Sequence, residues 1–149
     1  MPKQMNSSFG HAQSKKTYHT KNRVEKNDTL IYALGGLGEV GKNMYCYEHE
    51  NEICIVDCGV LFPGDDLLGV DYVIPDYHHL IRMNKKRKFL VITHGHEDHI
   101  GGIPFLLQQV KIDAIYAPRF AKALIHKKLS EYKGLENTKV IEIDENSSI

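Results

Sequence analysis

The stretch that decides the fold is Phe89-Leu90-Val91-Ile92-Thr93-His94-Gly95-His96-Glu97-Asp98-His99. It opens with an apolar run of strand length. It ends with four side chains of types that can bind metals, namely His94, His96, Asp98 and His99. Imidazole nitrogens and carboxylate oxygens are ligands that suit zinc. A strand ending in a tight loop presents the first two histidines on one side, while Asp98 and His99 turn elsewhere. This split favours two neighbouring metals over one.

Two other interpretations of the run are less consistent with its surroundings. A histidine-rich loop can be solvated surface, but here an apolar strand precedes the histidines and a helical pattern follows them. A His-Glu-x-x-His zinc helix needs histidines four residues apart, whereas His96 and His99 are three apart. The spacing therefore predicts a site in a loop rather than on a helix.

The composition describes one globular domain with a polar extension. The 149 residues are 42% hydrophobic, which allows a single core of ordinary size, and the net charge of zero does not exclude a local basic surface for nucleic acid. No apolar run is long enough to span a membrane.

Residues 1–27 are basic and nearly free of apolar periodicity. They predict a disordered tail without a secretory signal, so a cytoplasmic location is expected. The three cysteines form no Cys-x-x-Cys pair and are expected to be buried free thiols.

The pattern of apolar residues changes along the chain from hairpins to alternating strands and helices. It predicts strands at 30–34, 44–47, 53–56, 89–93, 114–116 and 139–143, and helices at 76–83, 99–110 and 118–132. This order indicates an α/β (α+β) fold in which helices cover a mixed sheet. The histidine motif then lies at the carboxyl end of a strand, where ligand sites are commonly found.

A glycine-rich segment before the second strand matches a dinucleotide-binding fingerprint in form. Gly36-Leu37-Gly38-Glu39-Val40-Gly41 fits G-x-G-x-x-G, but no helical pattern follows it. We therefore expect a turn between strands, in which the glycines let the backbone pass close to a metal centre or a substrate.

The motif and its flanking sequence resemble a known family. His94 to Gly102 is similar to the H-x-H-x-D-H signature of the metallo-β-lactamase superfamily, which glyoxalase II-like thioesterases share. With the flanking blocks Leu34 to Met44 and Phe62 to Asp71, the sequence resembles the ribonuclease J family of the β-CASP branch. The resemblance covers residues from Leu30 to the end of the chain.

The resemblance implies a partial metallo-β-lactamase αββα sandwich, with residues 28–149 as the amino-terminal half of that domain. It implies that His94 and His96 bind one Zn²⁺ and that Asp98 and His99 bind a second, with Mn²⁺ as an alternative metal. Asp57, at the end of the 53–56 strand, matches an aspartate of the family that supports the metal loop. Two metals activate a bridging water for attack on a phosphodiester, and Asp98 is the expected catalytic residue because it can orient that nucleophile.

The implied activity is endonucleolytic and 5′-exonucleolytic cleavage of RNA, in rRNA processing and RNA decay. RNA is the expected partner, and the ribosome or RNA-decay proteins are expected as further partners. No association with a membrane is expected, and full-length relatives are expected to form homo-oligomers. The family needs further ligands and a β-CASP region that are not found after His99, where His126 is the last histidine and lies in a basic amphipathic pattern. We therefore expect an amino-terminal piece carrying half an active site, inactive alone.

Two alternatives remain open at the level of sequence. In the first, the chain is a non-catalytic metal- or RNA-binding module that uses the tail and the basic run Lys85-Lys86-Arg87-Lys88. In the second, it is a glyoxalase II-like thioesterase.

Overall fold

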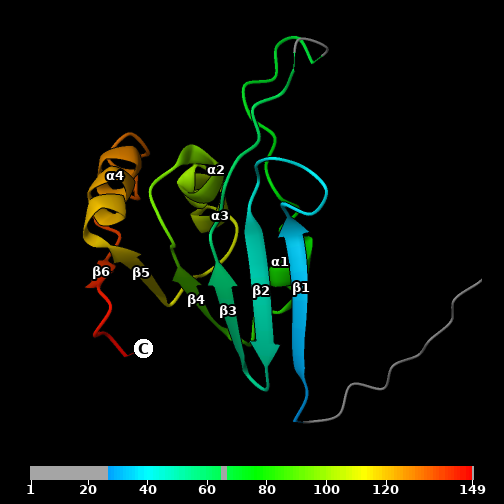
Figure 1. The fold of residues 1–149 in the computed structure, drawn as a ribbon, viewed down its shortest axis with the longest axis vertical. Helices are drawn as coiled ribbons and strands as arrows, with labels where there is room; N and C mark the ends of the chain where they lie inside the picture. Colours follow the sequence, from blue (N-terminus) through cyan, green and yellow to red (C-terminus); the bar gives the residue numbers. More distant parts are fainter. Residues whose placement is uncertain (1–26, 65–66, 149) are drawn as a thin grey trace, which may run out of the picture.

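The fold is a single six-stranded mixed sheet packed against four helices (Figure 1). The computed structural model describes residues 27–64 and 67–148, so nearly all of the predicted tail lies outside the described residues. The strands are β1 (Thr29–Gly35), β2 (Met44–His49), β3 (Glu52–Val56), β4 (Arg87–Val91), β5 (Ala114–Pro118) and β6 (Val140–Ile143). The helices are α1 (His78–Arg82), α2 (Glu97–Ile100), α3 (Ile103–Leu107) and α4 (Arg119–Leu129).

The strands lie in the sheet in the order in which they occur along the chain. β1, β2 and β3 are antiparallel neighbours, whereas β3, β4, β5 and β6 run parallel. A two-residue turn joins β2 to β3, and its first residue, Glu50, has a positive φ of 45°. Parallel neighbours need a crossover, and helices α1 to α4 lie in these connections. The predicted fold class and all six predicted strands are confirmed.

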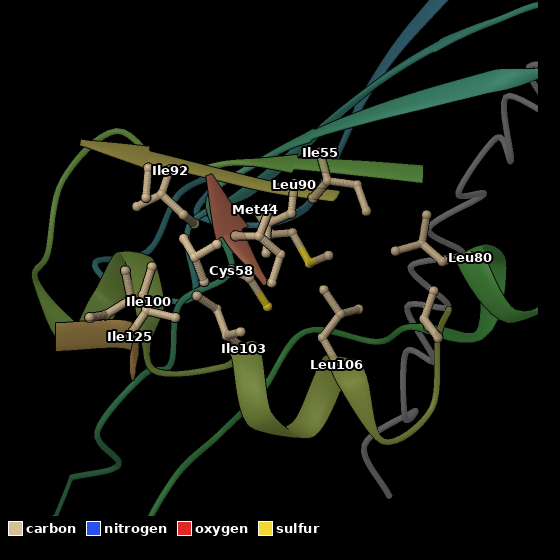
Figure 2. Close-up of a cluster of buried hydrophobic side chains, with 14 of the residues drawn as sticks. Met44, Ile55, Cys58, Leu80, Leu90, Ile92, Ile100, Ile103, Leu106 and Ile125 are labelled. Carbon is tan, nitrogen blue, oxygen red and sulfur yellow. The ribbon is translucent and has the colours of Figure 1, made fainter. Parts of the chain in front are cut away.

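The hydrophobic core lies on one face of the sheet (Figure 2). Strands contribute every second residue to it, as expected for a sheet buried on one side. Figure 2 shows these strand side chains facing side chains from the helices. The fully buried members include Met44, Ile55, Leu80, Leu90, Ile100, Ile103, Leu106, Ile115 and Ile125.

The opposite face of the sheet is left open in the described part of the chain, because all four helices contribute to that one core. Its side chains are only half-buried, and Cys54, Phe89, Val91 and Tyr116 line a pocket of about 480 Å³ there. The described residues therefore form a sheet that is covered by helices on one face. Within the described residues, no helix has the length and apolar character needed to cross a membrane.

The predicted helix at 99–110 is wrong in its bounds, and this changes where the motif lies. Two short helices, α2 and α3, replace it, and α2 already begins at Glu97. The break follows from Pro104, which has no N–H to donate to the carbonyl of Ile100. As a result, Asp98 and His99 lie on a helix while His94 and His96 lie in a loop, so the expectation of a site held entirely by a loop is also corrected.

Candidate metal centre

The four predicted ligands gather where two neighbouring parallel strands end. In Figure 1 the arrowheads of β3 and β4 point towards α2. Asp57 follows β3 directly, and the histidine motif begins three residues after β4. Because the carboxyl ends of parallel strands share one edge of a sheet, the backbone brings Asp57 to the motif across 42 positions of sequence.

Helix α2 is held by hydrogen bonds from two neighbouring loops. A helix of four residues is too short to be stable by itself. The carbonyls of Glu97, Asp98 and His99 accept hydrogen bonds from the backbone N–H groups of Val60, Asn43 and Cys58 at 3.2, 3.1 and 2.8 Å. The position of Asp98 and His99 therefore depends on contacts that are distant in sequence.

Gly59 allows this close approach. A Cβ atom built on Gly59 would lie 1.6 Å from the carbonyl oxygen of Asp98, so no other residue fits without moving α2. Gly41, in the glycine-rich turn, has a φ of +110° and passes close to the carbonyl of Val60. The turn holds no helix, which agrees with the rejection of a dinucleotide-binding loop.

Asp57 is a buried carboxylate whose hydrogen bonds organise the site. It is 4% exposed and adopts a positive φ of 63°, a conformation that aspartate tolerates better than most residues. It accepts hydrogen bonds from the backbone N–H of Thr93 at 2.8 Å and from the Thr93 hydroxyl at 2.8 Å. Its Oδ2 also lies 2.8 Å from His99 Nδ1.

These hydrogen bonds assign the tautomers of two histidines. A carboxylate only accepts, so His99 carries its proton on Nδ1, and its Nε2 is an acceptor that lies 3.3 Å from the amide nitrogen of Asn43. The Thr93 hydroxyl gives its single proton to Asp57, and therefore accepts from His94 Nδ1 at 3.0 Å. His94 Nε2 is then an acceptor as well, and it lies 3.1 Å from His96 Nδ1. A carboxylate that fixes a histidine in this way is typical of metal sites.

The two acceptor nitrogens lie beside other candidate ligand atoms at distances that would suit a shared metal. His94 Nε2 lies 3.1 Å from His96 Nδ1, and His99 Nε2 lies 3.4 Å from Asp98 Oδ2. Tetrahedral zinc with bonds of about 2.0–2.1 Å separates neighbouring ligand atoms by about 3.3 Å. The two pairs therefore fit zinc in donor type and in spacing.

The described residues do not complete either metal position. Within residues 27–64 and 67–148, no group of three or more histidine, cysteine, aspartate or glutamate side chains converges on a point that could hold a metal ion. Each pair supplies two ligands, whereas a stable zinc site uses three or four from the protein. The structure thus places the four predicted side chains in two adjacent pairs.

Sequence reasoning missed two residues of the site, Thr93 and Asn43. Thr93 links Asp57 to His94, as described above. The Asn43 side-chain amide lies 3.1 Å from Asp98 Oδ2 and 3.3 Å from His99 Nε2, so it holds the two side chains together. The signal for Thr93 was a polar residue closing an apolar strand, while nothing in the sequence distinguishes Asn43 from an ordinary turn residue.

The cysteines and the basic run take no part in this site. Burial raises the pKa of the Cys46 and Cys58 thiols to about 12, so neither is a thiolate at neutral pH. All three cysteines are free as predicted, but Cys54 is only half-buried, because it lies on the open face of the sheet. In the basic run, Lys88 is 2% exposed and donates to the carbonyls of Met83 and Lys86. Lys86 pairs with Glu48 at 2.7 Å. The run is therefore not the open basic surface that an RNA-binding module would need.

The fold and the site define the class of the protein. A mixed sheet carries paired histidine and aspartate side chains at the ends of its parallel strands, and the family model described as "Metallo-beta-lactamase superfamily" matches residues 37–146. The chain belongs to the metallo-β-lactamase superfamily. A crystal structure of a protein of unknown function from Enterococcus faecalis shares the fold, with a TM-score of 0.59 at 13% identity over 81% of this chain and 35% of that one.

Within this superfamily the chain is homologous to proteins named ribonuclease J. It is 52% identical over 130 residues to ribonuclease J of Mycoplasma genitalium and 54% identical over 125 residues to that of Mycoplasma pneumoniae. It is 53% identical over 126 residues to ribonuclease J 1 of Streptococcus pyogenes. These matches cover 84–87% of this chain but only 22–23% of the relatives, so the chain spans less than a quarter of their length.

Proposed function

We propose that the chain supplies the first metal-binding part of a ribonuclease active site that hydrolyses RNA phosphodiester bonds with two zinc ions. The observation that carries this proposal is the chain of hydrogen bonds from Asp57 to His94 and His99, which leaves a lone pair on each Nε2. Homology to ribonuclease J supports RNA as the substrate. The two pairs described above suit zinc, and Mn²⁺ accepts the same nitrogen and oxygen ligands.

Each side chain has a distinct role in this proposal. His94 and His96 hold one metal position, and Asp98 and His99 hold the other. The two metals, when bound, lower the pKa of a water molecule and neutralise charge on the phosphodiester oxygens. Asp98 orients the attacking oxygen, while Asp57 keeps the proton of His99 on Nδ1. Asn43 holds the Asp98 carboxylate in place.

The remaining ligands are proposed to come from sequence that follows this part in the longer relatives, because the described residues offer only two ligands to each metal. In that complete form we propose endonucleolytic and 5′-exonucleolytic cleavage, acting in rRNA processing and RNA decay in the cytoplasm, with ribosomes or RNA-decay proteins as partners. We also propose that the complete form is a homo-oligomer and that the isolated chain is inactive.

The test is cleavage by a protein that joins this chain to its downstream reading frame. We expect hydrolysis of a 5′-monophosphorylated RNA and no hydrolysis of a glutathione thioester. Asp98→Ala should lower RNA cleavage by about 100-fold or more, because a metal position loses a ligand. Asp76→Asn, a change at an exposed carboxylate beside α1, is the matched control and should leave the rate unchanged.

Two outcomes would contradict the proposal. Cleavage of the thioester but not of RNA would identify a thioesterase instead. An in-frame stop directly after Ile149, together with metal binding and no cleavage, would favour the non-catalytic module, which the incomplete ligand sets also suit.

A further inference from the structure

A pocket beside the candidate metal centre is lined both by residues of the histidine motif and by apolar residues. It measures about 320 Å³, and the acidic residues Glu97 and Asp98 line it together with the apolar residues Val40, Leu61 and Phe62. The volume lies at the lower end of the range for small-molecule sites. A chain bound at Asp98 would therefore lie against Phe62.

Phe62 is an exposed aromatic residue with support behind it. Its side chain is 57% exposed, and its ring meets that of Tyr72 at 5.6 Å in an edge-to-face contact. Tyr72 contacts Phe105 at 6.3 Å, and Phe105 contacts Tyr132 at 6.1 Å. The row of rings fixes Phe62 in place and leaves much of its surface open to solvent.

The charges around the pocket do not explain binding of a polyanion. Glu97 and Asp98 are acidic, while the neighbouring Lys42 and Lys128 are paired with Glu39 and Glu97 at 3.2 and 2.9 Å. A nucleic acid would thus gain little from phosphate contacts on this rim. An aromatic face, in contrast, stacks on any base.

We propose that Phe62, supported by Tyr72, is a stacking surface for one base of a single-stranded RNA whose backbone passes Asp98. The inference rests on the proposed function for the nature of the ligand. It adds a base-binding position that depends on stacking and not on charge.

The absence of tryptophan from the chain permits a direct test. Phe62→Trp introduces a single tryptophan at the proposed surface, and Phe120→Trp introduces one at the start of α4, where the native ring is 74% exposed. Each variant of the 149-residue chain is titrated with a decamer of adenylate and with an abasic decamer of the same charge, in the presence of two equivalents of Zn²⁺. We expect the decamer to quench tryptophan at 62 and not at 120, and the abasic strand to quench neither.

A binding measurement completes the test. Phe62→Ala should weaken binding of the adenylate decamer by about five-fold or more and leave binding of the abasic strand unchanged. Equal quenching at both positions, no quenching at 62, or equal loss for both strands would overturn the proposal. Quenching at 62 without RNA cleavage by the extended protein would support the stacking surface and contradict the proposed hydrolysis. Cleavage without quenching would contradict the stacking surface alone.

Discussion

At the scale of single residues, the site depends on which nitrogen of each histidine carries the proton. Asp57 and Thr93 settle this for His99 and His94 through three hydrogen bonds. Neither residue is a predicted ligand, yet both orient side chains that are. If the proposed metals bind, part of their affinity would come from side chains that do not touch the metal.

Thr93→Val tests the assignment without a metal. The variant keeps the shape of the side chain but removes the hydroxyl, so His94 should lose its preference for a proton on Nδ1, while His99 keeps its own through Asp57. Nitrogen chemical shifts of the imidazole rings, measured by NMR at neutral pH, report both tautomers. Thr93→Ser is the matched control and should behave like the native chain. An unchanged His94 in Thr93→Val would contradict the assignment.

A second buried carboxylate, Glu48, stabilises the fold near α1. It accepts hydrogen bonds from Tyr32, His79 and Lys86 at 3.0, 3.2 and 2.7 Å. Burial by itself raises the pKa of Glu48, but these hydrogen bonds outweigh burial and hold its pKa below the ordinary value of 4.5. Because the pKa is lowered in the folded state, the stabilisation is complete above about pH 4.5 and is lost as the pH falls through the lower folded value.

Glu48→Gln should therefore lower the free energy of unfolding by about 1.5–3 kcal/mol at pH 7, with a difference from the native chain that shrinks below pH 4.5. Urea denaturation between pH 3 and 7 measures this difference. Glu52→Gln is the control, because Glu52 pairs with Arg87 at the surface and such pairs contribute about 0–1 kcal/mol. Equal losses for the two variants would show that Glu48 is not a special position.

At the scale of elements, the decisive feature is that α2 is positioned by loops from elsewhere in the chain. Its carbonyls are bound by residues 43, 58 and 60, which follow or precede other strands. The sequence pattern identified the strand before the motif and the apolar residues after it. It could not identify α2, because this helix depends on these distant contacts and ends at Ile100, where Pro104 leaves the Ile100 carbonyl without a donor.

Gly59→Ala should displace α2, because the added methyl group would meet the carbonyl of Asp98. We expect a loss of about 1–3 kcal/mol in the free energy of unfolding, together with weaker zinc binding. Gly134→Asn is the control, because nothing lies within 4 Å of that position and asparagine tolerates its positive φ of 88°. A Gly59→Ala chain as stable as the native one would contradict this account of α2.

At the scale of the whole molecule, the described residues build one mixed sheet with helices packed on one of its faces. One face of the sheet carries four helices, and the other presents half-buried side chains such as Phe89 and Tyr116. The sequence predicted the mixed α/β fold, because its pattern of strands was complete, whereas the interpretation of residues 28–149 as the amino-terminal half of a sandwich stays a prediction. The hydrogen bonds of Thr93 to Asp57 and of Asn43 to Asp98 needed the three-dimensional structure, because they join residues 36 and 55 positions apart.

The central claim is that the motif after β4 binds metal through the side chains assigned to it. Zinc bound per chain and its dissociation constant, measured for the native chain, His96→Ala and His78→Ala, test this most directly; His78 is an exposed histidine on α1 and serves as the control. We expect the native chain and His78→Ala to bind zinc equally, and His96→Ala to bind it at least about tenfold more weakly. Equal zinc binding by all three chains would contradict this claim.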